Sequence, residues 1–207
     1  MSSGSASQKL TSILLAGSSH TRLFYPYVKR ALKGAASVSK LPYDAGRTDE
    51  MLISLPEWPV EGQDIIHIYA GHRDLMLCDD RNPYNGPAVF EANLRNIIAS
   101  IAKRSRAKMA LSNIPLVSED FLTVDPGWNR RIARYNRIIG RIAKDNLIPA
   151  HDFRKFISSL KGGEGKYLDG LHFTREVYRA FAEELSAYLM ALVKSSSPRA
   201  ILSPRKS

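Results

Sequence analysis

Cysteine and long apolar runs are both scarce in this sequence of 207 residues. The single cysteine, Cys78, excludes an internal disulfide and a metal site built from several thiolates. No stretch approaches the ~20 apolar residues that cross a bilayer, and the first apolar run, residues 13–16, is too short for the core of a signal peptide. We therefore expect a protein without a membrane span that resides in the cytoplasm.

Acidic residues are also few, because 20 Asp and Glu face 30 Lys and Arg and leave a formal net charge of +10. Part of the excess lies near the C-terminus. Another part forms a basic stripe at helical spacing within residues 128–145, made of Arg130, Arg134, Arg137 and Arg141. The stripe has two interpretations: it attracts an anionic partner, or it is a solvated outer face that aids solubility. No nucleic-acid-binding motif accompanies it.

Motifs for metals and phosphates are missing from the sequence as well. No cluster of His, Asp and Glu has the spacing of metal ligands, and no glycine-rich phosphate loop occurs. We therefore expect any catalysis by this chain to need neither a metal nor another cofactor.

The chain does contain a regular alternation of apolar runs and helical periodicities. Strands are predicted over residues 13–16, 36–42, 64–70, 107–112 and 147–152, and helices over 20–33, 51–55, 87–103, 128–145 and 175–193. Such alternation predicts one three-layer α/β domain with a mainly parallel five-stranded sheet, over residues 11–194. Residues 1–10 and the basic tail 195–207 are expected to be disordered.

The first strand ends abruptly at Gly17, and Ser18 and Ser19 follow before the first helix. A serine at such a turn lies at the carboxyl edge of a parallel sheet, where ligands bind beside the free N–H groups of a helix start. Ser19 is therefore a candidate nucleophile. The alternative is that Ser18 or Ser19 only caps the helix.

A candidate base and its orienting acid occur near the end of the chain. Asp169 and His172 are three residues apart in a predicted turn, so the carboxylate can accept from one ring nitrogen while the other faces Ser19. A serine nucleophile needs this arrangement of base and acid. The alternative is a local hydrogen bond without catalysis.

Four short blocks of the chain follow one another in the order Gly17-Ser18-Ser19-His20-Thr21, Gly46-Arg47-Thr48, Gly71-His72-Arg73-Asp74 and Asp169-Gly170-Leu171-His172. Their order and spacing resemble the SGNH hydrolases, also called the GDSL esterase/lipase family. The resemblance implies a flavodoxin-like sheet and hydrolysis of carboxylic esters through an acyl-enzyme. It also implies that Ser19 is the nucleophile, His172 the base and Asp169 its orienting acid, with the backbone N–H groups of Ser19 and Gly46 as oxyanion donors.

Two positions depart from the family pattern. The usual Asp before the nucleophile is Ser18, and the Asn expected as the third oxyanion donor is Arg73. Arg73 can stabilise the oxyanion with its own N–H donors, bind an anionic group of the substrate, or point away from the site. Asn113, after the fourth strand, is a possible substitute donor. His20 and His72 flank the site and either shape a polar pocket or lie at the surface.

The leading hypothesis is therefore a serine esterase acting on a small-molecule or carbohydrate ester, with a short acyl or O-acetyl group. Two alternatives stay open. In one, the acyl-enzyme is captured by a sugar hydroxyl, which makes the chain an O-acyltransferase. In the other, the fold is catalytically silent and uses Arg73 and the basic stripe to bind an anionic ligand or partner.

Overall fold

The computed structural model describes residues 9–79, 81–120 and 127–195, and most of the expected lead-in and tail lies outside them. Its sheet has the order β2-β1-β3-β4-β5, and every neighbouring pair of strands is parallel. The strands are β1 (Thr11–Ala16), β2 (Ala36–Lys40), β3 (Ile65–Tyr69), β4 (Lys108–Ser112) and β5 (Ala150–His151). The predicted five-stranded parallel sheet is confirmed.

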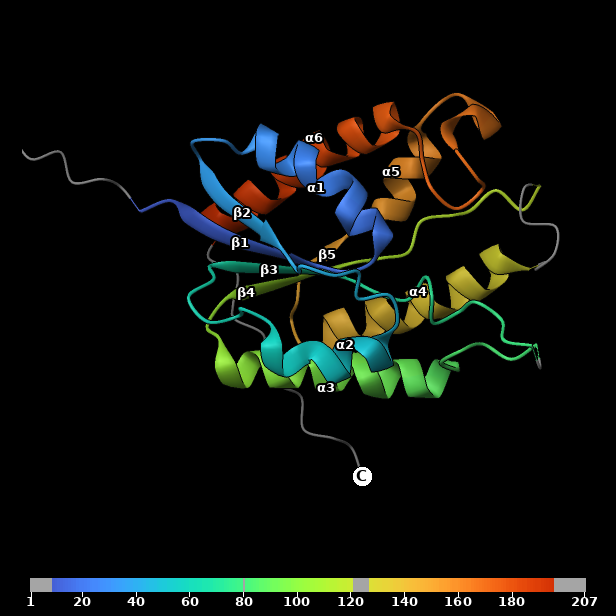
Figure 1. Ribbon diagram of the computed structural model, residues 1–207, viewed down its shortest axis with the longest axis horizontal. Helices are drawn as coiled ribbons and strands as arrows, with labels where there is room; N and C mark the ends of the chain where they lie inside the picture. Colours follow the sequence, from blue (N-terminus) through green and yellow to red (C-terminus); the bar gives the residue numbers. More distant parts are fainter. Residues whose placement is uncertain (1–8, 80, 121–126, 196–207) are drawn as a thin grey trace, which may run out of the picture.

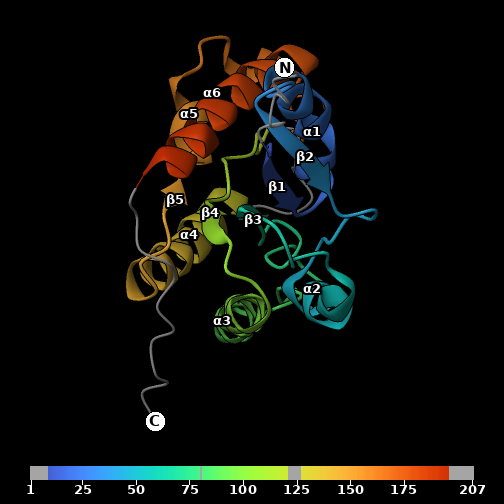
Figure 2. The same cartoon turned by 90° about the vertical axis from the view of Figure 1, so that its left-hand side faces the viewer.

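Helices cover both faces of this sheet (Figure 1). One face carries α1 (Ser19–Ala31), α5 (Phe153–Ser159) and α6 (Arg175–Lys194), and the other carries α2 (Thr48–Ser54), α3 (Pro87–Arg104) and α4 (Trp128–Asp145). In Figure 2 the sheet lies between α6 and α3. Short 3₁₀ turns occur at Leu55–Glu57 and Gly163–Lys166. The predicted three-layer α/β architecture is confirmed.

The first strand, β1, is buried on both faces, which explains why its sequence is continuously apolar and does not alternate with polar residues. Ile13 and Leu15 pack into the core beneath α1 and α6, whereas Leu14 and Ala16 pack into the core on the opposite face. Side chains alternate between the faces of a strand, so a strand covered on both sides needs apolar residues throughout. The continuous apolar pattern of β1 therefore indicates a central position in the sheet.

All five strands point the same way, so their carboxyl ends meet at one edge, at the right of Figure 1. The chain leaves β1 toward α1 on one face and leaves β3 toward α3 on the other. Ligands bind at such a switch point in open α/β sheets, because the diverging connections leave a crevice between them. The fold thus places the loops after β1 and β3 at a binding position.

The region after β4 departs most from the prediction. Strand β5 has only two residues instead of the predicted 147–152, and α5 occupies a segment that the sequence analysis leaves without a helix. The Asp152 carboxylate accepts the backbone N–H of Lys155 at 2.9 Å and so caps α5. Phe153 and Ile157, four residues apart, bury one face of this short helix.

Candidate active site

The turn that carries the candidate nucleophile depends on a glycine. A Cβ atom on Gly17 would lie 2.3 Å from the Thr21 Oγ1 atom and 2.7 Å from the Tyr69 carbonyl oxygen. The Tyr69 oxygen belongs to the backbone of β3 and cannot move aside, so only glycine fits between β1 and β3 here. The chain therefore turns directly from β1 into α1 and exposes Ser19 at the carboxyl edge.

The two serines of the turn have different roles. Ser18 occupies the N-cap position of α1, yet its side chain makes no capping hydrogen bond to any residue that the structure describes. Ser19 is the first residue of the helix, and its Oγ lies 2.9 Å from Nε2 of His172. The Ser19 hydroxyl is thus directed at a histidine rather than at the helix backbone.

His172 is held in the orientation that this contact requires. Its Nδ1 atom lies 2.8 Å from Oδ2 of Asp169, and the other carboxylate oxygen accepts the backbone N–H groups of Leu171 at 3.0 Å and His172 at 2.7 Å. Since Nδ1–H donates to the carboxylate, Nε2 is left as the acceptor for the Ser19 hydroxyl. The structure brings the three residues together in the order that proton abstraction needs.

The Asp169 carboxyl is kept ionised by these contacts. Partial burial acts to raise its pKa, but the hydrogen bonds from the His172 backbone and ring and from the Leu171 backbone outweigh burial, and the pKa lies below its usual value. An ionised Asp169 stabilises a positive charge on His172 after the proton arrives.

The second block of the resemblance lies beside this turn. The backbone N–H of Ala45 donates to the Gly17 carbonyl at 3.1 Å and so holds Gly46 against the turn. A Cβ atom on Gly46 would lie 2.5 Å from Cδ and 2.6 Å from Nη1 of Arg73. The Arg73 side chain therefore lies directly over Gly46. Its Nη1 atom is 3.7 Å from a Glu50 oxygen, and half of the side chain is exposed.

A buried carboxylate ties the second and third blocks together. Asp74 accepts the backbone N–H of Thr48 at 3.0 Å, the Thr48 hydroxyl and the Asn85 side-chain amide at 2.8 Å. Burial raises the Asp74 pKa, although these hydrogen bonds oppose the rise. The loops that carry Gly46 and Arg73 are consequently anchored to the same group, which fixes their relative position.

The Asn113 side chain is hydrogen-bonded at the start of α5. Its amide Nδ2 donates to an Asp152 oxygen at 2.6 Å, and its Oδ1 accepts the backbone N–H of Arg154 at 2.8 Å. Both ends of the side chain therefore serve the start of α5. These bonds give no support to Asn113 as the substitute oxyanion donor.

His20 and His72 are buried beneath the catalytic candidates, with exposures of 1% and 3%, so the surface interpretation is wrong. Their rings stack with centroids 4.9 Å apart, and the His20 ring lies 5.3 Å from that of His172. Their Nδ1 atoms contact the hydroxyls of Tyr178, at 2.8 Å, and Tyr69, at 2.7 Å. Burial, aided by the neighbouring His172, lowers the pKa of His72 to about 3 and keeps its ring neutral.

Tyr69 and Tyr178 are the site neighbours that sequence reasoning leaves unassigned. Tyr69 ends the buried strand β3, and Tyr178 lies on the buried face of α6. A buried tyrosine hydroxyl almost always needs a hydrogen-bond partner. Two tyrosines at core positions were therefore a signal that polar groups lie inside the core near the strand ends.

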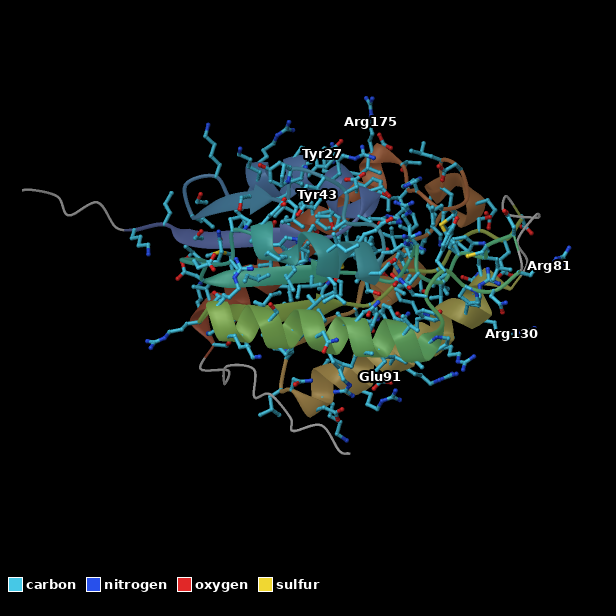
Figure 3. All side chains as sticks on the ribbon, turned by 60° about the horizontal axis from the view of Figure 1, so that its bottom comes forward. Tyr27, Tyr43, Arg81, Glu91, Arg130 and Arg175 are labelled. Atoms are coloured by element: carbon cyan, nitrogen blue, oxygen red, sulfur yellow. The ribbon has the colours of Figure 1, made fainter. Side chains whose placement is uncertain are left out.

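The basic stripe is exposed along α4, and Arg130 lies at the end of the molecule where the strands terminate (Figure 3). Arg141, further along the helix, forms an ion pair with Glu91 of α3. Within the described residues, no group of His, Cys, Asp and Glu has an arrangement that could hold a metal ion. The same part of the chain has no helix that is long and apolar enough to cross a membrane.

Comparison with known proteins gives both a family and a fold. A model of the GDSL-like lipase/acylhydrolase family matches residues 15–180. A lipase/acylhydrolase from Enterococcus faecalis superimposes with a TM-score of 0.74 at 20% identity, over 92% of this chain and 100% of that one. The acetyl xylan esterase AlAXEase gives 0.71 at 15% identity, over 86% and 99%. An acetylxylan esterase from Geobacillus stearothermophilus gives 0.67 at 14% identity, over 92% and 97%. No curated protein matches the sequence significantly.

Proposed function

This chain belongs to the GDSL-like lipase/acylhydrolase family, and from that premise we propose that it is a serine hydrolase that cleaves a carboxylic ester through an acyl-enzyme on Ser19. The observation that carries the proposal is the 2.9 Å contact between Ser19 Oγ and His172 Nε2, with the opposite ring nitrogen bonded to Asp169. Ser19 lies 153 residues from His172 along the chain, so no local structural need accounts for their meeting.

The reaction follows from the tautomer of His172. The Ser19 oxygen attacks the ester carbonyl carbon while its proton passes to His172 Nε2, and a tetrahedral oxyanion forms. When this intermediate collapses, the bond to the alcohol oxygen breaks and His172 gives its proton to that oxygen. A water molecule, deprotonated by the same nitrogen, then attacks the acyl-enzyme and releases the acid and the free serine.

The oxyanion would be stabilised from the Gly46 side of the serine. The backbone N–H of Ser19 has no partner within its own helix because it belongs to the first turn. Gly46 follows Ala45, whose N–H is bonded to the Gly17 carbonyl, and the Arg73 guanidinium lies against Gly46. We assign the Gly46 N–H as the second donor. We assign Arg73 as the third donor, since its charge and five N–H groups can satisfy a developing oxyanion.

A short acyl group, and an O-acetyl ester of a carbohydrate in particular, is the substrate class that we favour. Two of the similar solved structures are acetylxylan esterases. The buried pair of His20 and His72 also places polar rings next to the proposed base.

Intact-mass analysis after treatment with a fluorophosphonate tests the nucleophile. We expect one adduct on Ser19 in the parent chain, with none in Ser19→Ala and none in His172→Ala within the same time. Ser112→Ala is the matched control, because Ser112 is a second serine whose hydroxyl contacts histidine rings. An unlabelled parent would overturn the proposal and favour the silent binding domain, whereas labelling that persists in Ser19→Ala would overturn it by showing that another residue is the nucleophile.

A further inference from the structure

A single buried hydroxyl connects the two segments that meet in the candidate active site. Helices α1 and α6 pack side by side on one face of the sheet (Figures 1 and 2). Tyr178 lies in the first turn of α6, and only 2% of it is exposed. Its hydroxyl contacts one residue at the start of α1 and one residue in the loop before α6.

Both contacts end on residues that directly follow the proposed reacting groups. The Tyr178 hydroxyl oxygen lies 2.8 Å from Nδ1 of His20, the residue after Ser19. The same oxygen accepts the backbone N–H of Phe173, the residue after His172, at 3.4 Å. One side-chain atom thus joins two segments whose reacting residues are 153 positions apart.

Counting donors and acceptors assigns the proton between Tyr178 and His20. Burial raises the pKa of Tyr178 and lowers that of His20, so the hydroxyl keeps its proton and the imidazole is neutral. A hydroxyl has one proton and two lone pairs, and one lone pair takes the Phe173 N–H. The hydroxyl proton therefore goes to His20 Nδ1. The opposite tautomer would leave that proton without an acceptor among the residues that the structure describes.

The His20 ring carries the constraint to the proposed base as well. It is 1% exposed, and its centre lies 5.3 Å from that of the His172 ring and 4.9 Å from that of His72. A ring enclosed in this way cannot turn without displacing its neighbours, because protein interiors are close-packed. Tyr178 therefore constrains the base from two directions, through the backbone of Phe173 and through the ring of His20.

The apolar interface between the two helices does not depend on this hydroxyl. The helices share a core of fully buried apolar side chains, among them Phe24 and Val28 of α1 and Phe181 and Leu185 of α6. A phenylalanine in place of Tyr178 keeps the ring in this core and removes only the hydroxyl. Its loss is therefore expected to leave the helices packed and to release the alignment of their ends.

We propose that Tyr178 is a positioning residue whose hydroxyl holds the Ser19 turn and the His172 loop at the separation that keeps Ser19 Oγ in contact with His172 Nε2. This inference rests on the proposed hydrolase function. Because Tyr178 is buried, it acts through the reacting pair and not on the ester itself. Its hydroxyl should accordingly govern kcat and leave KM unaffected.

Steady-state kinetics of Tyr178→Phe with p-nitrophenyl acetate test the inference. We expect kcat to fall by about 10–100-fold with KM near the parental value, because small displacements of reacting groups are costly. Tyr135→Phe is the matched control, since Tyr135 is equally buried but lies on α4, on the opposite face of the sheet, where its hydroxyl donates to the Asn85 carbonyl at 2.6 Å. Urea unfolding should show a loss of stability in both variants. A parental kcat in Tyr178→Phe, or an equal fall of kcat in Tyr135→Phe, would overturn the inference.

A double variant tests whether Tyr178 and His20 act as one unit. His20→Phe keeps a ring in the stack and removes the Nδ1 contact, so kcat should fall by a smaller factor than in Tyr178→Phe. In the double variant the loss should be less than the product of the two single losses, because both changes remove the same contact. A loss equal to that product would overturn the inference. So would a parental kcat in His20→Phe, which keeps the test decisive even if Tyr178→Phe does not fold.

Nitrogen chemical shifts separate this inference from the proposed function, because they need no hydrolysis. In a long-range proton–nitrogen correlation spectrum, the His172 Nε2 signal reports the contact with the Ser19 hydroxyl, and Ser19→Ala gives its position without that contact. We expect Tyr178→Phe to move the signal toward the Ser19→Ala position and Tyr135→Phe to leave it in place. An unmoved signal in Tyr178→Phe would refute the positioning role even in an active esterase. A moved signal in a chain that hydrolyses no ester would support that role and refute the hydrolase.

Discussion

The fold contains two hydrogen-bonded sets of a serine, a histidine and a carboxylate, and the two sets differ in their surroundings. We call them the edge triad, made of Ser19, His172 and Asp169, and the core triad, made of Ser112, His151 and Glu184. In the core triad the Ser112 oxygen lies 3.2 Å from His151 Nδ1, and His151 Nε2 lies 2.6 Å from the Glu184 carboxylate.

The two serines have opposite surroundings. Ser112 is 2% exposed and also contacts Nε2 of His67 at 3.0 Å, so its oxygen is enclosed between two rings. Ser19 is partly exposed, begins a helix, and has Gly46 and Arg73 beside it. The comparison teaches that the three residue types do not make a nucleophile. On our proposal, access for the ester and nearby donors for the oxyanion distinguish Ser19 from the enclosed Ser112.

Removing each serine gives the largest contrast. We expect Ser19→Ala to lower kcat for p-nitrophenyl acetate by about 10⁴–10⁶, because the covalent route is lost. Ser112→Ala should keep the parental kcat. It should instead lower the free energy of unfolding by about 1–3 kcal/mol, since two buried rings lose a hydrogen-bond partner. Initial rates and urea unfolding of both variants are the measurements. Similar losses of kcat in the two variants would contradict the assignment.

Changing each carboxylate gives the next largest contrast. In Asp169→Asn the new amide can donate to Nδ1 of His172 and favour the wrong tautomer, so kcat should fall by about 10²–10⁴. Glu184→Gln should leave kcat near the parental value, because Glu184 is half exposed and remote from the ester. A steady-state comparison of kcat and KM checks both, and an Asp169→Asn enzyme with parental kcat would refute the role of that carboxylate.

Arg73 tests whether donors beside the edge triad matter. We expect Arg73→Ala to lower kcat by about 10², the loss that follows removal of one oxyanion donor. Arg22→Ala is a matched control, because both side chains are about half exposed, at 52% and 50%, and each faces a carboxylate. A rise in KM with kcat unchanged would instead assign Arg73 to substrate binding and not to oxyanion stabilisation.

The smallest effect concerns the acid stability of the core triad region. Burial, aided by the neighbouring His151, lowers the pKa of His67 to about 3, whereas an unfolded histidine titrates near 6.5. Between those values the unfolded chain binds the extra proton, so stability is complete above about pH 6.5 and is lost as the pH falls toward 3. His67→Gln keeps a donor for Ser112 and removes the titration. Urea unfolding across this range should show a shallower decline in that variant, by up to about 1.4 kcal/mol per pH unit.

The sequence was sufficient for the sheet and for the convergence of the blocks that follow its first three strands. Parallel strands share one carboxyl edge, so residues that follow β1, β2 and β3 converge whatever their separation along the chain. The three-residue spacing of Asp169 and His172 predicted their pairing, and the resemblance of the four blocks implied their meeting with Ser19.

The burial of His20 and His72 could not be predicted in the same way. It depends on Tyr178 of α6 and Tyr69 of β3 coming to lie beside them, which is a tertiary contact without a local pattern. The position of Arg73 over Gly46 likewise depends on how two loops pack. Helix α5 was missed because its apolar face has only two turns, too few for a clear periodicity.

The packing of the first helix against the last has a consequence for biosynthesis. Ser19 and His172 are 153 residues apart, and they meet on a face where α1 packs on α6. A ribosome releases the chain from its N-terminus, so the proposed nucleophile emerges long before the proposed base. A nascent or truncated chain that ends before residue 172 lacks the proposed base, so on our proposal the Ser19 hydroxyl gains its partner only after nearly the whole domain has been synthesised and folded.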